Sequence, residues 1–84
     1  MRVLKYRLHE GLNTLTTPGT SKLVYLDYQD NKLHGWILET EGPHQDEYEV
    51  YIALTGQQVP LEYNYVTSTQ TQPGGGYYVV HAFD

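Results

Sequence analysis

Residues 22–38 read KLVYLDYQDNKLHGWIL, and they decide the fold. Residues 22–28 and 32–38 are both rich in aromatic, aliphatic and β-branched side chains, which favour strands. Between them, Gln29-Asp30-Asn31 is typical of a turn. The stretch therefore predicts a β-hairpin of two well-formed strands.

The residues before this hairpin also alternate with a period of two. Leu4, Tyr6 and Leu8 share one face of a first strand, while Lys5 and Arg7 occupy the other. Residues 12–16 return as a short strand, and Thr-Pro-Gly-Thr at 17–20 is typical of a turn. We expect the first two strands to form a hairpin of their own.

The residues after the hairpin begin with an acidic segment, 39–47, which contains Gly42-Pro43 and predicts a solvated loop. Residues 48–54 alternate apolar and polar side chains and predict a half-buried strand. A short strand at 63–69, a glycine-rich turn at 72–76 and a last strand at 77–83 follow. The chain therefore predicts an all-β single domain over residues 1–84, a small antiparallel sandwich or open barrel of six to seven strands.

Length and composition limit how this domain can be stabilised. A chain of 84 residues buries a thin core, and this one has no cysteine for a disulfide. We therefore expect a homo-oligomer in a reducing compartment, with the cytosol as the default. The opening residues lack the apolar core of a signal peptide, and no apolar run reaches the length of a membrane span, so neither export nor spanning is expected.

Charge is unevenly distributed along the chain. The net charge is −5, all five basic residues precede Gly35, and seven of the ten acids lie from Glu39 onward. A net-acidic chain argues against binding to duplex nucleic acid, which needs clustered Lys and Arg. A local basic patch on the first strands is compatible with this distribution.

The sequence predicts no catalytic residue, no metal ligand and no cofactor. Ser21 and Ser68 lie in no nucleophile motif, and the four histidines lack the spacing of paired metal ligands. The glycines at 74–76 are followed by residues typical of a strand, whereas a phosphate-binding loop needs a lysine and a helix. We expect a binding protein rather than an enzyme.

The excess of tyrosine suggests how such a protein would bind. Nine tyrosines accompany one Trp and one Phe, and tyrosine suits both strands and contact surfaces. Aromatic rings stack on flat heterocycles, and basic side chains on the first strand could meet phosphate. The residues predicted to line the site are Lys5, Tyr6, Arg7, Tyr25, Trp36, Tyr51 and Tyr78.

Short stretches in a fixed order span nearly the whole chain. They are Lys5-Tyr6-Arg7-Leu8, Pro18-Gly19 before Leu23, Gln29-Asp30-Asn31 leading to Trp36-Ile37-Leu38, Tyr51 to Gly56, YVTSTQ at 65–70, and the ending Val80-His81-Ala82-Phe83-Asp84. Together they resemble a family of short uncharacterised tailed-phage and prophage proteins. Where that family tends to have Gly-Thr-Gly-His, this chain reads Leu54-Thr55-Gly56-Gln57, so no histidine role carries over there.

The resemblance implies a virus-encoded accessory protein that acts in the cytoplasm of the infected bacterium. Small phage proteins of this kind are often countermeasures against host immunity, and some resemble oligomeric sponges that sequester cyclic nucleotide signals. Such a sponge needs a preformed pocket at a subunit interface and no reactive group. The leading expectation is therefore a homo-oligomer that sequesters a cyclic di- or oligonucleotide.

Two alternatives stay open. In the first, the chain is a protein-binding inhibitor whose acidic segment 39–49 mimics nucleic acid or docks on a basic host factor. In the second, the chain is a minor structural or assembly protein of the virion and binds no small ligand.

Overall fold

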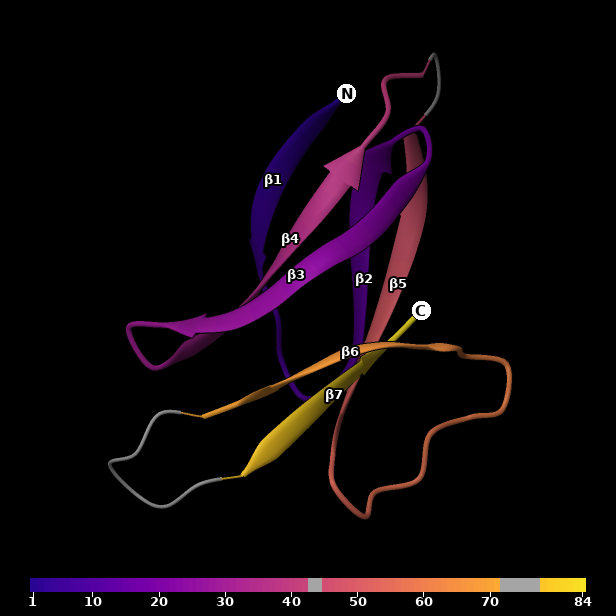
Figure 1. Ribbon diagram of the computed structural model, residues 1–84. Coiled ribbons are helices and arrows are strands. Elements are labelled where there is room, and N and C mark those ends of the chain that lie inside the picture. The colour runs from indigo at the N-terminus through magenta and orange to yellow at the C-terminus, as the bar shows by residue number, and fades with distance from the viewer. Residues whose placement is uncertain (43–44, 72–77) are drawn as a thin grey trace.

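Seven antiparallel strands occur within residues 1–42, 45–71 and 78–84, which the computed structural model describes. They are β1 (Arg2–Arg7), β2 (Gly11–Pro18), β3 (Ser21–Gln29), β4 (Lys32–Glu39), β5 (Gln45–Leu54), β6 (Tyr65–Gln70) and β7 (Val79–Phe83). Sheet A has the strand order β1-β4-β3, and sheet B has the order β2-β5-β7-β6 (Figure 1). The prediction of a small all-β sandwich is confirmed.

The central hairpin joins β3 and β4, as residues 22–38 predict. Its register ends with Gln29 opposite Lys32, which leaves two residues in the turn. Asp30 and Asn31 have φ values of 52° and 62°, in the left-handed region that a two-residue type I′ turn requires. Asp and Asn adopt this region more readily than other residues with a side chain.

The predicted hairpin of the first two strands is wrong. The strand β1 pairs with β4 in sheet A, and β2 pairs with β5 in sheet B. Between them the chain crosses from one sheet to the other, with Leu8 buried in the core. The crossing is held by the His9 amide, which donates to Asn13 Oδ1 at 2.8 Å, and by Asn13 Nδ2, which donates to the Val50 carbonyl at 3.1 Å. Both strands can then face one core from opposite sides.

The predicted acidic loop is shorter than residues 39–47. Glu39 ends β4, where it pairs with Arg2 of β1 and Ser21 of β3, and its side chain is buried because it shares the inward face of β4 with Leu33 and Ile37. The next strand, β5, already begins at Gln45, so the acids at 46 and 47 belong to a strand. Charge alone predicts solvation, whereas cross-strand pairing extends both strands into the acidic segment. The predicted turn at 72–76 lies outside the described residues.

The core lies between the two sheets and is built from aliphatic side chains. Its buried members are Leu8, Leu23, Leu26, Leu33, Ile37, Val50, Ile52, Val80 and Ala82. Gly35 of β4 lies beneath two of these side chains, because an added Cβ would stand 2.8 Å from Leu8 Cδ1 and 2.9 Å from Leu23 Cδ1. Glycine at this position lets the two leucines approach the backbone of sheet A.

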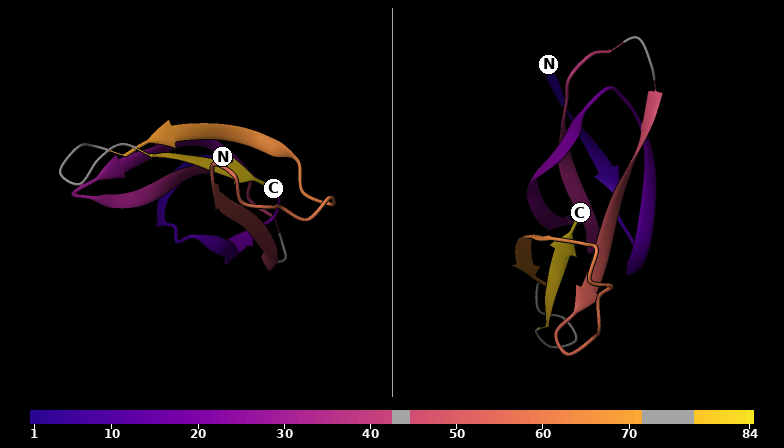
Figure 2. Two further views of the ribbon diagram at one scale, coloured as in Figure 1. Left: turned by 90° about the horizontal axis from the view of Figure 1, so that it is seen from below. Right: turned by 90° about the vertical axis from the view of Figure 1, so that its right-hand side faces the viewer.

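Tyr48 ties the two sheets together where β6 runs beside β3 (Figure 2). Its hydroxyl donates to Asp84 Oδ2 at 2.7 Å and accepts the Leu23 amide at 2.8 Å. Burial, followed by the hydrogen bond to Asp84, raises the pKa of Tyr48 well above its ordinary value. The phenol therefore stays neutral throughout the range in which the unfolded chain keeps its tyrosines protonated.

No helix in the described ranges is long and apolar enough to cross a membrane.

We expect Tyr48→Phe to lower the free energy of unfolding by about 1–3 kcal/mol, because the buried Leu23 amide loses its acceptor. The unfolded chain ionises tyrosine near pH 10, while folded Tyr48 stays neutral. The stability that Tyr48 contributes is therefore present below about pH 10 and is lost as the pH rises above it. Urea unfolding at pH 8 and pH 11 measures this, and the gap between wild type and Y48F should narrow at pH 11.

Tyr63→Phe is the matched control, since the Tyr63 hydroxyl donates to Glu49 at 3.0 Å in an exposed position. We expect it to change stability little. Equal losses in Y48F and Y63F would show that Tyr48 does not hold the sheets together.

Candidate ligand-binding site

The outer face of sheet A gathers most of the basic side chains of the protein, and we refer to it as the basic face. Side chains on this face alternate with core side chains along each strand, as the register shows. Its members are Val3, Lys5 and Arg7 of β1, Lys32, His34, Trp36 and Leu38 of β4, and Lys22, Tyr25, Asp27 and Gln29 of β3.

The two sheets differ in charge. The strands of sheet A contain all five Lys and Arg residues and two acids, of which Glu39 is buried. The strands of sheet B contain no Lys or Arg and three acids, Asp46, Glu47 and Glu49. The molecule therefore presents a basic surface on one sheet and an acidic surface on the other, despite its net negative charge.

Trp36 lies at the centre of the basic face, on the middle strand of sheet A. It stands between Lys5 of β1 and Tyr25 of β3 in one cross-strand row. The Tyr25 ring meets the indole edge-to-face at a centroid distance of 5.2 Å, and the His34 ring lies 6.3 Å from it. Aromatic pairs in these orientations are favourable, so the three rings form a stable cluster.

The cations on β1 flank this cluster. Lys5 Nζ donates to Gln29 Oε1 at 3.0 Å, and because Gln29 belongs to β3, the bond bridges across β4. Arg7 lies opposite His34 in the next row. Within the described part of the chain, neither cation forms an ion pair with a carboxylate. Their charge is therefore available to an anion.

The one acidic side chain of the basic face is engaged by its neighbours. Tyr25 donates its hydroxyl to Asp27 Oδ2 at 3.0 Å, and Asp27 Oδ1 accepts the Tyr28 amide at 2.8 Å. The hydrogen bond to Asp27 is the main reason why the pKa of Tyr25 is raised. Tyr25 therefore remains an uncharged aromatic surface at neutral pH.

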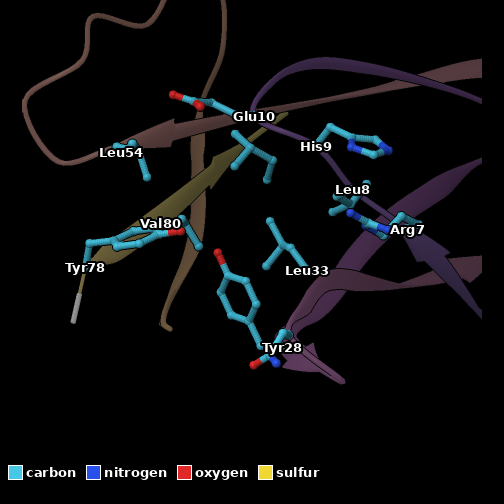
Figure 3. Close-up of a pocket in the computed structure, with 11 residues that line it drawn as sticks. Arg7, Leu8, His9, Glu10, Tyr28, Leu33, Leu54, Tyr78 and Val80 are labelled. Atoms are coloured by element: carbon cyan, nitrogen blue, oxygen red, sulfur yellow. The ribbon is translucent and has the colours of Figure 1, made fainter. Parts of the chain in front are cut away.

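A pocket opens between the sheets at the end of the basic face (Figure 3). It has a volume of about 210 Å³, and Arg7 belongs to both the pocket and the face. Figure 3 shows Tyr28 and Leu33 entering from sheet A, with Leu54 and Val80 on the side of sheet B. The full lining is Arg7, Leu8, His9, Glu10, Tyr28, Asn31, Leu33, Ile52, Leu54, Tyr78 and Val80. An apolar floor with a polar rim suits the end of a small aromatic group.

The seven residues predicted from sequence divide among four environments. Lys5, Arg7, Tyr25 and Trp36 converge on the basic face. Tyr78 lines the pocket, where it also meets the partly buried Tyr28. Tyr6 and Tyr51 lie elsewhere, because each occupies the opposite face of its strand or the other sheet.

Tyr6 points into the sandwich. Its hydroxyl donates to Glu39 Oε2 at 2.5 Å, and this bond is the main cause that raises the pKa of Tyr6. The other oxygen, Glu39 Oε1, is buried and has no hydrogen-bond partner among the described residues. Tyr6 thus satisfies half of a buried carboxyl group, which is a structural role.

Tyr51 lies on the outer face of sheet B. There it belongs to a cross-strand row that runs through Leu12, Tyr51, Phe83 and Tyr65. Tyr63, from the loop after β5, packs on Tyr51 at a centroid distance of 5.5 Å. Sequence reasoning missed this row because its four members come from four strands whose order is not written in the sequence.

A hydrogen-bonded chain of hydroxyls surrounds His81 on the same sheet. Ser68 Oγ lies 2.7 Å from His81 Nδ1, Thr55 Oγ1 lies 2.8 Å from Nε2, and the Tyr65 hydroxyl lies 2.8 Å from Ser68 Oγ. Both ring nitrogens are occupied, so the imidazole is fixed in place by its neighbours. No group of three His, Asp or Glu side chains in the described residues is placed to hold a metal ion.

Sequence reasoning also missed His34 and Tyr28. The signal for His34 was present, because it stands two residues before Trp36 and must share its face in a strand. Tyr28 could not be found in this way, because its place in the pocket depends on how sheet B packs over sheet A.

Comparison with known proteins gives one family. Residues 1–84 match the model of a domain of unknown function (DUF7352). No curated protein and no solved structure matches the chain.

We expect Tyr6→Phe to lower the free energy of unfolding by about 1–3 kcal/mol, since it removes the donor to the buried Glu39 carboxyl group. Tyr25→Phe, which removes an exposed hydrogen bond to Asp27, should change stability little. Thermal and urea unfolding of both variants measure the difference. A Y6F variant as stable as Y25F would place Tyr6 among the surface residues instead.

Proposed function

We propose that this chain, which belongs to the DUF7352 family, is a non-enzymatic binding protein that holds a nucleotide on its basic face. The observation that carries the proposal is the row formed by Lys5, Trp36 and Tyr25, with Arg7 and His34 in the next row. These five side chains come from three strands, and β1 is distant in sequence from both β3 and β4. Packing has thus brought cations and aromatic rings onto one surface.

Phosphate is the first ligand group that this surface favours. Lys5 and Arg7 stand two residues apart on the same face of β1, and no carboxylate neutralises them within the described residues. Charge-assisted hydrogen bonds from Lys and Arg to phosphate are stronger than neutral ones, and Arg can donate two in parallel. The two side chains can therefore hold adjacent phosphate oxygens.

A flat base is the second group that it favours. Base stacking on an aromatic side chain is sequence-tolerant and contributes about 1–3 kcal/mol per base. The indole of Trp36 is half-buried and the Tyr25 ring is more than half exposed, so both offer aromatic surface beside the cations. This supports a nucleotide over an inorganic anion.

We further propose that the ligand is a cyclic di- or oligonucleotide signal, sequestered at an oligomer interface. A cyclic ligand presents bases and phosphates close together, as the basic face presents rings and cations. The face is open on one side, so a neighbouring copy would complete the enclosure. The resemblance to small tailed-phage and prophage proteins supports a role against host immunity in the bacterial cytoplasm.

The test is a binding screen with a panel of cyclic di- and oligonucleotides, in which thermal shift and calorimetry measure the binding. One ligand should raise the melting temperature by several degrees. Lys5→Gln combined with Arg7→Gln should weaken its binding at least tenfold, and Trp36→Ala should weaken it by about 5- to 100-fold.

Lys32→Gln is the matched control, because Lys32 lies at the end of β4, outside the two rows that carry the proposal. It should change affinity less than threefold. A protein indifferent to every nucleotide, or equal losses in the K32Q and K5Q/R7Q variants, would contradict the proposal.

A second candidate function is binding of a basic host protein through the acidic surface. Glu47 and Glu49 of β5 meet Glu62 and Asp84 around a concavity of about 390 Å³, which Tyr48 and Tyr63 complete. Such a surface favours a Lys- or Arg-rich partner. Glu47→Gln with Glu49→Gln would then abolish a salt-sensitive interaction while leaving nucleotide binding intact.

A role in virion assembly would show instead as copurification of the protein with virus particles.

A further inference from the structure

Four strands of the sandwich have an unpaired edge, whose free backbone N–H and C=O groups can pair with another chain. The edges of sheet A are β1 and β3, and those of sheet B are β2 and β6. Natural sheets protect edges with charged side chains, irregular register or covering segments.

Three of the four edges are protected. The strand β1 carries three cations, Arg2, Lys5 and Arg7, among its six residues. The register is irregular in β3 between Leu23 and Tyr25, and in β6 between Tyr65 and Thr67. These last two strands also lie against each other, so each covers the edge of its neighbour.

The edge of β2 has neither charged side chains nor an irregular register. Its eight residues, GLNTLTTP, include no charged side chain, and its pairing with β5 is regular from Gly11 to Pro18. Its three threonines and two leucines favour extended structure. The side chains that point outward, at 12, 14 and 16, are exposed, and Leu12 is half exposed.

The inner face of β2 is also incompletely covered. Leu15 packs against the core but remains partly exposed, although it faces the sheet interface. Its inward polar neighbours are satisfied internally: Asn13 donates to the Val50 carbonyl, and Thr17 Oγ1 accepts from Ser21 Oγ at 2.7 Å. A further strand beside β2 would therefore cover apolar surface and would leave neither of these polar side chains without a hydrogen-bond partner.

We propose that a second copy of this chain pairs with β2, antiparallel, through its own β2. Alternate residues of β2 point their backbone N–H and C=O groups away from β5, toward the free edge. Pro18 has no N–H, so the pair spans residues 11–17 and its two-fold axis lies at Thr14. Such a contact is self-complementary and closes after two copies. It joins the two four-stranded B sheets into one.

Charge permits this contact despite the acidity of sheet B. The nearest acids, Glu47 and Glu49, lie on β5, one strand behind the edge. In the pair, the two β5 strands are separated by three strand spacings, or about 14 Å. That distance exceeds the Debye length of about 8 Å at physiological salt, so their repulsion is screened. Pairing of β2 with the β1 strand of a second copy is less favourable, because β1 carries cations and the two strands are not self-complementary.

The pair also fixes how the basic faces are presented. A two-fold axis between antiparallel strands of one sheet is perpendicular to that sheet, so both copies of sheet A lie on the same side of the joined sheet B. The dimer would therefore present two basic faces side by side. The dimer does not depend on any ligand.

The test is the mass of the full chain in solution, measured by analytical ultracentrifugation across a concentration series. The wild type should sediment as a species of about twice 9.7 kDa. Thr14→Lys places two ammonium groups opposite each other at the centre of the pair and should raise the dissociation constant at least tenfold. Thr14→Val should remain dimeric, and Val3→Lys, at a half-exposed position on β1, should behave as the wild type.

Hydrogen exchange of the wild type gives a second, mutation-free measurement. The edge-facing amides, at alternate residues of 11–17, should become more protected as the protein concentration rises. A wild type that stays monomeric, or a dimer weakened by V3K but not by T14K, would overturn the proposal. If the β2 amides became protected only when a host protein was added, the partner of β2 would be a strand of that protein and not a second copy, and the proposal would be overturned.

Discussion

The packing of Leu8 and Leu23 over Gly35 is the contact on which the rest of the structure depends. Gly35 sits in the middle strand of sheet A, and the absence of a Cβ lets both leucines reach the backbone. Leu8 continues the inward alternation of β1, its amide still donates to the Leu33 carbonyl of β4 at 2.9 Å, and the chain then crosses to the other sheet. The crossing puts β1 and β2 in different sheets, and the two-sheet topology follows from it.

The same topology separates charge. Basic residues cluster early in the sequence, and the strands that contain them all join sheet A, while the acids of β5 are placed on sheet B. One small molecule thereby carries a cationic, aromatic surface and an acidic surface on opposite sides. Both proposed functions use this division, since a phosphate ligand and a basic protein would bind opposite faces.

Alternation along a single strand predicted the facing of the β1 side chains correctly. It placed Lys5 and Arg7 on one face of β1 and Leu4 and Tyr6 on the other, as the structure has them. It could not tell which tyrosines face outward, because that depends on which side of each strand meets the core. Tyr6 was therefore included in the site, although it faces Glu39 in the interior.

The sequence by itself determined the β class, the hairpin of residues 22–38 and the alternation of each strand. These features depend on local preference and turn chemistry, which act between residues close in the chain. Only the tertiary structure decided the pairing of β1 with β4, the burial of Glu39, and the assembly of Lys5, Trp36 and Tyr25 into one row. Those outcomes depend on contacts between distant segments, which are selected by the shared burial of apolar faces.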